Sequence, residues 1–403
     1  MSLELEDLLS NSVITEAAPG PVLHDFELML DFVDKAAPSL TKTHLLSLSD
    51  LTPLNQKLHR RIELGLARPV QKSFPHINGL FLLLRASGLT VLDGSGRRPR
   101  LTTDAIALQS WKSLNCDERY FCLLESWFMR GDPSTVGEWS GPSALHVPLL
   151  GWAEFYDRLQ RNSWREDDWV ERVNYRPGIL NLALMELFGL VDIEDAAPVD
   201  RKGWQIRNVR GTPWGQALLA ALWSDLGDNW EFWMQLDQPY LVRPGALQPF
   251  IQPYRPEWRR PLDLPSDEFQ PGLYVFKVSL DRDIWRQIII RDIATLDDLS
   301  DAILNAFEFD HDHLFRFVYE TRFGLEAEVL HPYMDEGTSA AEVRVGDLPV
   351  QAGFHMIYNY DFGDNWLFDV TLERIDPPHP GARLYRIGDR HGEAPEQYPS
   401  WEE

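Results

Sequence analysis

Six side chains near the carboxyl end of the chain are of the types that perform acid–base or metal chemistry. They are Asp310, His311, Asp312, His313, Asp361 and Asp364. Carboxylates and imidazoles gathered in one small domain can hold Mg²⁺, Mn²⁺ or Zn²⁺ and activate a water molecule for phosphodiester hydrolysis. Alternate residues of an extended segment point to opposite faces, so the carboxylates of 310–313 could share one face and the imidazoles the other. One hypothesis is therefore a metal-dependent hydrolase or nuclease with a divalent metal cofactor.

The same region is also typical of a hairpin turn, which requires no reaction. In residues 358–366, YNYDFGDNW, Gly363 and Asn365 tolerate a positive φ and Asp364 can cap local amides. The flanking strands would place their aromatic side chains on one face for cross-strand packing. These aromatic residues are Tyr358, Tyr360, Trp366 and Phe368. On this interpretation 310–313 is a solvated connection with His313 hydrogen-bonded at a strand edge, and the protein has no catalytic residue and no cofactor.

Basic side chains in the first part of the chain point to a second kind of chemistry, contact with phosphate. Between Lys42 and Lys112 there are eleven Lys or Arg against four Asp or Glu. The candidate nucleic-acid-binding residues are Lys57, Arg60, Arg61, Arg97, Arg98 and Arg100. The first three would face outward from a predicted helix, and the last three lie on a predicted hairpin. Contacts of this kind supply affinity for DNA or another polyanion without reading its sequence.

The overall charge would normally argue against such contacts, because an acidic surface repels phosphate. The 403 residues carry a net charge of −24. In residues 267–376 alone, eight basic residues stand against twenty-three acidic ones, a local net charge of −15. The average therefore hides two surfaces of opposite sign, and we expect the acidic one to bind protein.

Composition excludes several classes of protein. A hydrophobic content of 44% with 12% aromatic residues indicates folded domains rather than bulk disorder. No window approaches eighteen uncharged apolar residues and the amino-terminal segment is acidic, so we expect neither a membrane span nor a signal peptide. Cys116 and Cys122, the only cysteines, have a spacing that suits neither a disulfide framework nor a zinc site. These features predict a cytoplasmic protein with no membrane partner.

Two similar groups of elements must position the basic residues. The first group is a helix that stops near Gly65, an apolar helix over 75–88, a hairpin with its tip at 93–98, and a further helix. Helix, helix, hairpin, helix is the order of a winged-helix domain, in which the hairpin can clamp phosphate. The apolar helix is too apolar to serve as a recognition helix, because it must be largely buried.

The second group repeats this order and indicates a diverged internal duplication. Gly88-Leu89 corresponds to Gly189-Leu190, and Thr102 corresponds to Thr212. The alternative is that any small helical domain containing a hairpin would look similar.

The third group of elements is different, because strands dominate it. Residues 274–280 alternate as a half-buried strand should, and 284–290 follow as a partner strand. Thr295 and Asp298 form a capping box in front of an amphipathic helix. Further strands complete an α+β domain that contains both 310–313 and 358–366.

The third group resembles the plasmid pRiA4b ORF-3-like family, some members of which are passenger proteins of insertion elements with a resolvase-like label. The segments that carry the resemblance are YVFKVSLDRDIWRQIII, FDHDHLFRFVY and YNYDFGDNWLFDVTLERI, within about 272–376. The resemblance implies a small α+β domain of mobile-element ancestry with no settled activity. Many members continue into a cysteine-containing segment, whereas this chain continues as RLYRIGDRHGEAPEQYPSWEE, so a metal or redox role of that segment is not expected here.

The predicted fold class is multidomain α+β, with a winged-helix-like amino-terminal half. The expected parts are a flexible amino terminus (1–20), a winged-helix-like domain with a basic face (21–135), a second winged-helix-like or helical domain (144–242), a proline-rich linker (243–267) and the plasmid pRiA4b ORF-3-like domain (268–403). We expect a bacterial accessory protein that acts by binding, with DNA or another polyanion on the basic face and protein on the acidic domain. The hydrolase remains the alternative, and a purely structural interaction protein is a third possibility.

Overall fold

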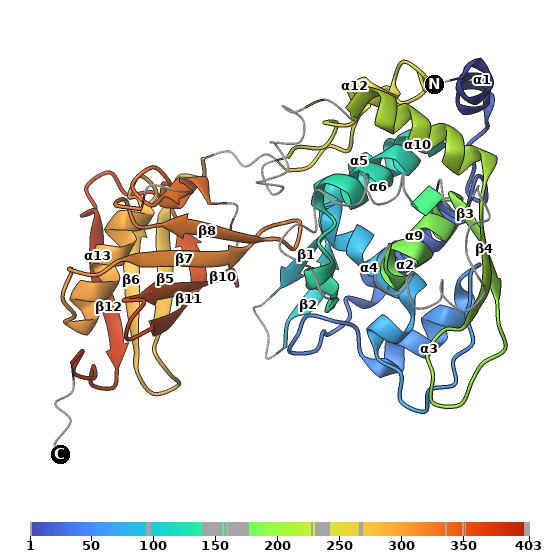
Figure 1. Ribbon diagram of the computed structural model, residues 1–403. Helices are drawn as coiled ribbons and strands as arrows, with labels where there is room; N and C mark the ends of the chain where they lie inside the picture. Colours follow the sequence, from blue (N-terminus) through green and yellow to red (C-terminus); the bar gives the residue numbers. More distant parts are fainter. Residues whose placement is uncertain are drawn as a thin grey trace. The chain divides into compact units, whose positions relative to one another are not determined.

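The computed structural model of the chain describes residues 2–93, 98–138, 155–156, 159, 177–226, 229, 242–265, 269–334, 337–348, 350 and 352–398. The chain divides into two compact units, drawn in Figure 1. The first unit is Met1–Leu92, Arg98–Pro265 and Arg322–Leu325, and the second is Asp93–Arg97, Ser266–Thr321 and Glu326–Glu403. The described residues include both helices and a large sheet, so the predicted α+β class is confirmed. No helix in the described ranges has the length and apolar character needed to cross a membrane.

Helices dominate the first unit. The longer ones are α1 (Leu3–Asn11), α2 (Val22–Ala36), α3 (Leu48–Lys57), α4 (Pro75–Ala86), α5 (Ala105–Ser113), α6 (Cys116–Arg130), α9 (Ile179–Leu187) and α10 (Pro213–Leu226), and the short ones are η1 (Gln71–Ser73), η2 (Pro133–Val136) and α12 (Gln248–Ile251). Two separate hairpins accompany them, β1 (Thr90–Asp93) with β2 (Arg100–Thr103), and β3 (Val191–Asp195) with β4 (Ile206–Gly211).

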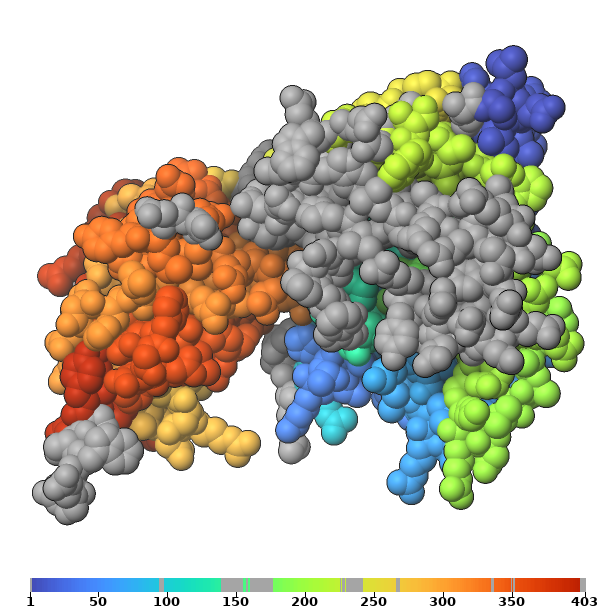
Figure 2. Space-filling model, in the orientation of Figure 1, coloured from blue at the N-terminus to red at the C-terminus, as the bar shows by residue number. Residues whose placement is uncertain are grey.

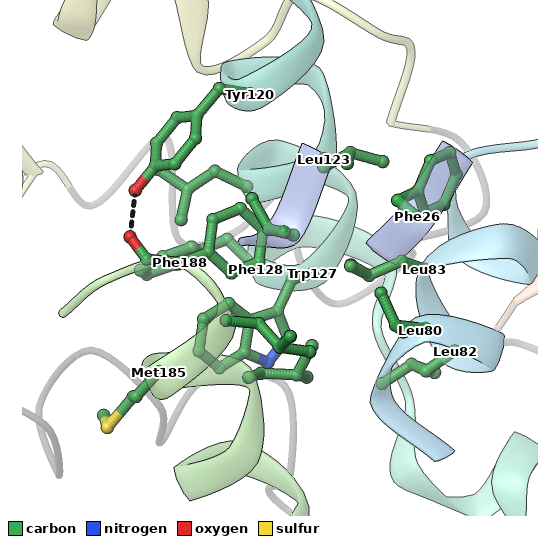
Figure 3. Close-up of a cluster of buried hydrophobic side chains, with 14 of the residues drawn as sticks. Phe26, Leu80, Leu82, Leu83, Tyr120, Leu123, Trp127, Phe128, Met185 and Phe188 are labelled. Carbon is green, nitrogen blue, oxygen red and sulfur yellow. Dashed lines mark hydrogen bonds between the residues drawn. The ribbon is translucent and has the colours of Figure 1, made fainter. Parts of the chain in front are cut away.

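Large apolar side chains from α2, α4, α6 and α9 form the core of the first unit (Figure 3). Every residue of α4 is buried, as its apolar sequence predicts, so this helix cannot address a ligand. The Trp127 ring stacks on Phe188, with centroids 5.3 Å apart. The Tyr120 hydroxyl donates a hydrogen bond of 2.7 Å to the Phe188 carbonyl, and Figure 3 shows this bond at the end of α9.

Two helix–hairpin–helix groups share the same backbone turn. The groups are α4–β1–β2–α5 and α9–β3–β4–α10. Each first helix ends at a glycine with positive φ, Gly88 at 76° and Gly189 at 71°, a conformation that glycine adopts without strain. The correspondence of these glycines, expected from the sequence, is therefore visible in the backbone.

The other correspondence, between Thr102 and Thr212, is wrong. The Thr212 N–H donates to the Leu190 carbonyl at 3.1 Å, and in the first group the Asp104 N–H donates to the Leu89 carbonyl at 2.9 Å. Asp104 and Thr212 each accept hydrogen bonds from backbone amides at the start of the following helix. Asp and Thr are both common helix-capping residues. Matching threonine with threonine therefore paired Thr212 with Thr102, whereas the equivalent residue is Asp104.

The first helices of the two groups pack directly on each other. A Cβ placed on Gly79 of α4 would lie 2.8 Å from Cγ of Leu184 in α9. This close approach explains a glycine inside a helix, where it normally costs about 1 kcal/mol. The two groups therefore share one core instead of forming separate ones.

Three segments differ from their sequence-based descriptions. Residues 1–20, expected to be flexible, contain α1, whose Leu9 is fully buried. The helix expected to stop near Gly65 ends at Lys57. The linker expected at 243–267 is described over 243–265, and this part packs into the first core through the fully buried Trp258.

The second unit is built on a mostly antiparallel sheet, in which neighbouring strands follow the order β12-β6-β5-β11-β10-β7-β8-β9. The strands are β5 (Leu273–Ser279), β6 (Trp285–Arg291), β7 (Phe315–Glu320), β8 (Glu326–Leu330), β9 (Thr338–Ser339), β10 (His355–Tyr360), β11 (Trp366–Asp376) and β12 (Tyr385–His391). Helix α13 (Leu296–Phe307) packs on one face of the sheet, as Figure 1 shows. The predicted capping box is confirmed, since the Asp298 N–H donates to Thr295 Oγ1 at 3.1 Å and the Thr295 N–H donates to Asp298 at 2.8 Å.

The opposite face of this sheet is polar and joined by side-chain pairs. His355 Nε2 lies 3.0 Å from an Asp369 carboxylate oxygen, and Arg316 donates to Glu328 at 2.9 Å. Such alternation of a buried and a solvated face is typical of antiparallel sheets. The buried Arg286 of β6 donates to the Ala306 carbonyl at the end of α13, and this bond explains why an arginine occupies a core-facing position of the strand.

Candidate functional site

The segment 358–366 is a hairpin turn between β10 and β11. Tyr360 pairs with Trp366, and the five residues between them make the turn. The residues with positive φ are Asp361, at 52°, and Asn365, at 54°. Gly363 does not have the positive φ that the sequence suggested. Asp361, and not Asp364, caps the turn, because its Oδ1 accepts hydrogen bonds from the backbone N–H groups of Gly363 and Asp364.

Aromatic side chains on the two strands share one face, as predicted. Tyr358 lies opposite Phe368 in the register, and both are fully buried beneath α13. The Tyr358 hydroxyl is 2.6 Å from the Ser300 hydroxyl of α13. Burial raises the pKa of Tyr358 well above its ordinary value, although the Ser300 hydrogen bond acts in the opposite direction.

Three of the six candidate metal ligands meet around His313, because antiparallel pairing of β7 with β10 brings Asp361 to an imidazole that Asp312 also approaches. His313 Nε2 lies 3.6 Å from Asp361 Oδ2, 3.4 Å from Asp312 Oδ1 and 2.8 Å from the Tyr398 hydroxyl. The side chain of Asp361 is only 10% exposed, whereas that of His313 is 37% exposed. An imidazole and a buried carboxylate therefore meet at the surface, although their 3.6 Å separation is longer than the reach of about 2.6–3.2 Å for direct proton transfer.

The remaining candidate ligands diverge. His311 turns toward α13, where its Nδ1 lies 2.9 Å from Asp301 Oδ1. Asp310 and Asp364 are exposed, and Asp310 contributes its backbone to the contacts described below. Within the described residues, no group of three or more His, Cys, Asp or Glu side chains is arranged to hold a metal ion. The alternation expected along 310–313 is therefore wrong: this connection bends instead of running as a strand, and His311 and His313 contact different partners.

The contacts of His313 also differ from those of a catalytic triad. Both carboxylates and the Tyr398 hydroxyl approach the same nitrogen, Nε2. In a triad the carboxylate orients the imidazole through Nδ1 and leaves Nε2 for the reacting group. His313 is consequently placed as a hydrogen-bonding partner of Tyr398. Partial burial raises the pKa of Tyr398, and the negative charge of Asp312 contributes to the same shift.

Arg60 does not face solvent, which corrects a central expectation for the basic residues. Its Nε donates to Glu186 Oε1 at 2.7 Å, and its Nη2 donates to Asp195 Oδ1 at 2.5 Å. Its side chain is only 18% exposed. The guanidinium group is neutralised by these two carboxylates and is not available to phosphate.

Arg100 is also committed within the fold. Its guanidinium donates to the carbonyls of Ala37 and Ala36 at the end of α2, at 2.8 and 3.3 Å. A cation at this position satisfies the free carbonyls of a helix end. Arg98 is exposed beside it, and Arg97 lies outside the described residues.

Lys57 and Arg61 face solvent, although they do not lie on one helix. Leu58 is buried between them, and the Asp25 carboxylate accepts the backbone N–H groups of His59 and Arg60. The Asn55 side chain donates to the Ile62 carbonyl and accepts the Ile62 N–H. Leu54, Leu58 and Ile62 are all buried, so a loop reproduces the apolar spacing that suggested a longer helix.

A second segment adds cations that the sequence analysis missed. The Gly65 N–H donates to the Lys202 carbonyl at 3.1 Å, and the Arg201 N–H donates to the Gly65 carbonyl at 2.9 Å. A Cβ on Gly65 would collide with the Val199 carbonyl, so only glycine permits this pairing. In Figures 1 and 2 the lime β3–β4 loop and a blue segment protrude together at the lower margin of the first unit.

We define the basic surface as Lys57, Arg61, Arg68, Arg201 and Lys202, all of which are exposed. Among the described residues, four of these cations form no ion pair, and Arg201 forms only an exposed one of 3.6 Å with Asp200. The sequence alone shows that Arg201 and Lys202 lie in a predicted hairpin loop, which is a recognisable signal for phosphate contact. Their position beside Gly65 could not be predicted, because it depends on a tertiary contact.

Burial and hydrogen bonding act against each other on Asp195, which anchors the segment beside the basic surface. Burial raises the pKa of its carboxyl, but hydrogen bonds from Arg60 and Trp204 outweigh burial and hold the pKa below its ordinary value. The Trp204 Nε1–H donates to Asp195 at 2.9 Å. The charged network therefore fixes the loop 58–62 against β3 without contributing net positive charge.

The two cysteines are free, and Cys122 is buried. Burial raises the pKa of the Cys122 thiol, so this side chain stays protonated and unreactive.

Comparisons with known proteins concern the second unit. A model of the plasmid pRiA4b ORF-3-like protein family matches residues 273–397, which confirms the resemblance and extends it to Gln397. A solved structure of a protein of unknown function from Methanosarcina mazei Go1 is 25% identical, with a TM-score of 0.29, over 32% of this chain and 73% of that chain. The search of curated proteins found no match.

Proposed function

We propose that this protein binds the phosphate backbone of duplex DNA through the basic surface of its first unit, and that it acts by binding instead of turnover. The observation that carries the proposal is the pairing of Gly65 with Arg201 and Lys202. This pairing brings together two segments that are far apart in the sequence and that both carry exposed cations.

The proposal also accounts for the winged-helix order of the two groups. In winged helices the hairpin can clamp phosphate. The hairpin that does so here is β3–β4, whose loop carries Arg201 and Lys202. In the β1–β2 hairpin, Arg100 is engaged by α2. The mobile-element ancestry implied by the family resemblance accords with a role on DNA.

Charge distribution supports the assignment of this role to the first unit. Residues 267–403 hold 28 of the 62 acidic residues but only 11 of the 38 basic ones. The first unit is therefore much closer to neutral than the whole chain. The acidic second unit repels phosphate, and we propose that it binds protein.

A salt titration of DNA binding tests the proposal. The triple variant Arg61→Ala/Arg68→Ala/Lys202→Ala should bind a duplex more weakly than the unmodified chain. If each side chain neutralises one phosphate, the log–log dependence of affinity on salt should flatten by about 2–3. Fluorescence anisotropy of a labelled duplex at several salt concentrations measures both quantities.

A matched control changes the same net charge elsewhere. Arg282, Arg383 and Arg386 are exposed in the second unit, so the triple alanine variant at these positions should retain the original salt slope. Equal effects of the two triple variants, or no binding by the unmodified chain at low salt, would eliminate the proposal.

A second candidate, metal-dependent hydrolysis of a phosphodiester, rests on one contact, the 3.6 Å between His313 and Asp361. Asp361 would be the residue that holds the metal ion, the metal would supply Lewis-acid activation of water, and His313 would accept a proton. The measurement is cleavage of single- and double-stranded substrates with added Mg²⁺, Mn²⁺ or Zn²⁺. Cleavage that persists in a His313→Ala variant would exclude this site as its source.

A further inference from the structure

We propose that residues 394–398, here called the strap, form a detachable ligand of a site made by Asp310, His313 and Tyr360, and that the strap of a second copy of the chain can occupy the same site. We call these three residues the strap site. The proposal concerns the second unit alone and is independent of DNA binding by the first.

Gln397 is the centre of the interaction. It is only 8% exposed, which is unusual for a glutamine at the surface of a domain. Its Oε1 accepts the Asp310 backbone N–H at 2.6 Å, and its Nε2 donates to the Tyr398 hydroxyl at 2.8 Å. Both ends of the carboxamide are therefore used. The Asp310 N–H would lose its protein partner if the strap moved away.

Tyr398 supplies the second point of attachment. Its hydroxyl lies 2.8 Å from His313 Nε2 and is itself oriented by Gln397. The neighbouring Tyr360 hydroxyl donates to the Asp310 carbonyl at 2.5 Å and fixes the backbone that Gln397 addresses. The strap site thus presents one amide donor and one imidazole nitrogen at fixed positions. A carboxamide followed by a phenol matches this pair.

The strap is detachable because little besides these side chains holds it. Among the described residues, no backbone–backbone hydrogen bond joins 393–398 to the rest of the chain. Glu393 and Glu396 are exposed, and Ala394 is only partly buried against the core. Segments with few buried contacts and no backbone pairing open at much lower free energy than the fold as a whole.

Occupation by a second copy follows from the same contacts. A strap from another chain presents an identical carboxamide and phenol, so exchange restores every hydrogen bond that opening removes. Exchange of an identical element between copies is a low-cost route to association. The partner therefore recognised by the strap site is a segment of this chain's own sequence.

Hydrogen exchange at one amide tests the closed strap. In the full chain, Gln397→Ala should accelerate exchange of the Asp310 amide by about tenfold or more, because its acceptor is removed. The Asp361 amide, which donates to the Leu314 carbonyl at 3.0 Å, should be unaffected and serves as a control for an intact fold. An unchanged Asp310 rate would overturn the proposal.

Binding of the strap in trans tests its detachability. The probe is a labelled synthetic peptide, HGEAPEQY, which corresponds to residues 391–398. The full-chain variant Gln397→Ala/Tyr398→Ala has a vacated strap site and should bind the peptide at least about tenfold more tightly than the unmodified chain does. In the peptide, Gln397→Ala should abolish binding while Glu396→Gln should not.

Two outcomes of this experiment would contradict the proposal. The first is equal affinity of both proteins for the peptide, and the second is indifference to the Gln397→Ala change in the peptide. If the double variant loses its fold, the milder Tyr398→Phe replaces it, since this change removes only the hydroxyl that contacts His313. The expected order of affinities is then the same, with a smaller difference.

Discussion

At the scale of single residues, the types of candidate functional residue were easier to predict than the directions in which their side chains point. His313 and Asp361 were both among the candidate metal ligands and do meet, because antiparallel pairing places the end of β10 next to the start of β7. Arg60 was recognised as a functional cation but turns inward to Glu186 and Asp195, which lie more than a hundred residues further along the chain. No local pattern reveals such a partner. The direction of a side chain is decided by tertiary contacts.

Removal of Arg60 should be costly in a way that removal of Arg61 is not. Arg60→Ala leaves Glu186, which is only 11% exposed, with His76 but without its guanidinium partner, and should lower the free energy of unfolding by about 1–3 kcal/mol. Arg61→Ala should change it by less than about 0.5 kcal/mol, because Arg61 is exposed. Urea denaturation of both variants provides the comparison, and similar losses would contradict the structural role of Arg60.

The same network predicts a dependence on pH. The folded-state pKa of Asp195 is below its ordinary value, so its ionised form stabilises the fold above about pH 4, the unfolded value. This contribution is lost as the pH falls through the lower folded-state pKa. Acid unfolding curves should therefore lose this component in Asp195→Asn, whereas Asp192→Asn, an exposed control on the same strand, should leave it in place.

At the scale of elements, hydrophobic spacing predicted the second unit well and part of the first unit poorly. The alternation of β5, the cap of α13 and the hairpin β10–β11 follow from local pairs of residues. Helix α3 ends earlier than the sequence predicted. Leu58 and Ile62 continue the helical spacing of apolar residues, but they lie in a loop that buries them. Hydrogen bonds from the His59 N–H to Asp25 of α2 and from the Ile62 N–H to the Asn55 side chain compete with the helix.

Gly65 provides a test at this scale. A methyl group at this position would collide with the Val199 carbonyl, so Gly65→Ala should separate the loop 61–68 from the β3–β4 loop. We expect a loss of about 1–3 kcal/mol in stability, together with weaker DNA binding. Gly203→Ala is the control, because a Cβ there meets no atom within 4 Å. Retention of DNA affinity in Gly65→Ala would argue against the paired basic surface.

At the scale of the whole molecule, composition predicted more than one core and the charge asymmetry located the acidic one. Two separate clusters of buried apolar residues are present, one in each unit. The sequence suggested that the two helical groups have independent cores. No local sequence pattern shows that they share one core, because the shared core depends on tertiary contacts. The contacts that join them include the close approach between Gly79 and Leu184 and a separation of 2.7 Å between His76 Nε2 and Glu186 Oε2.

That approach between α4 and α9 has a consequence for the first unit as a whole. Each helix covers part of the apolar surface of the other, and every residue of α4 is buried. A fragment that carried one group alone would leave this stripe in contact with water, which is unfavourable for apolar side chains.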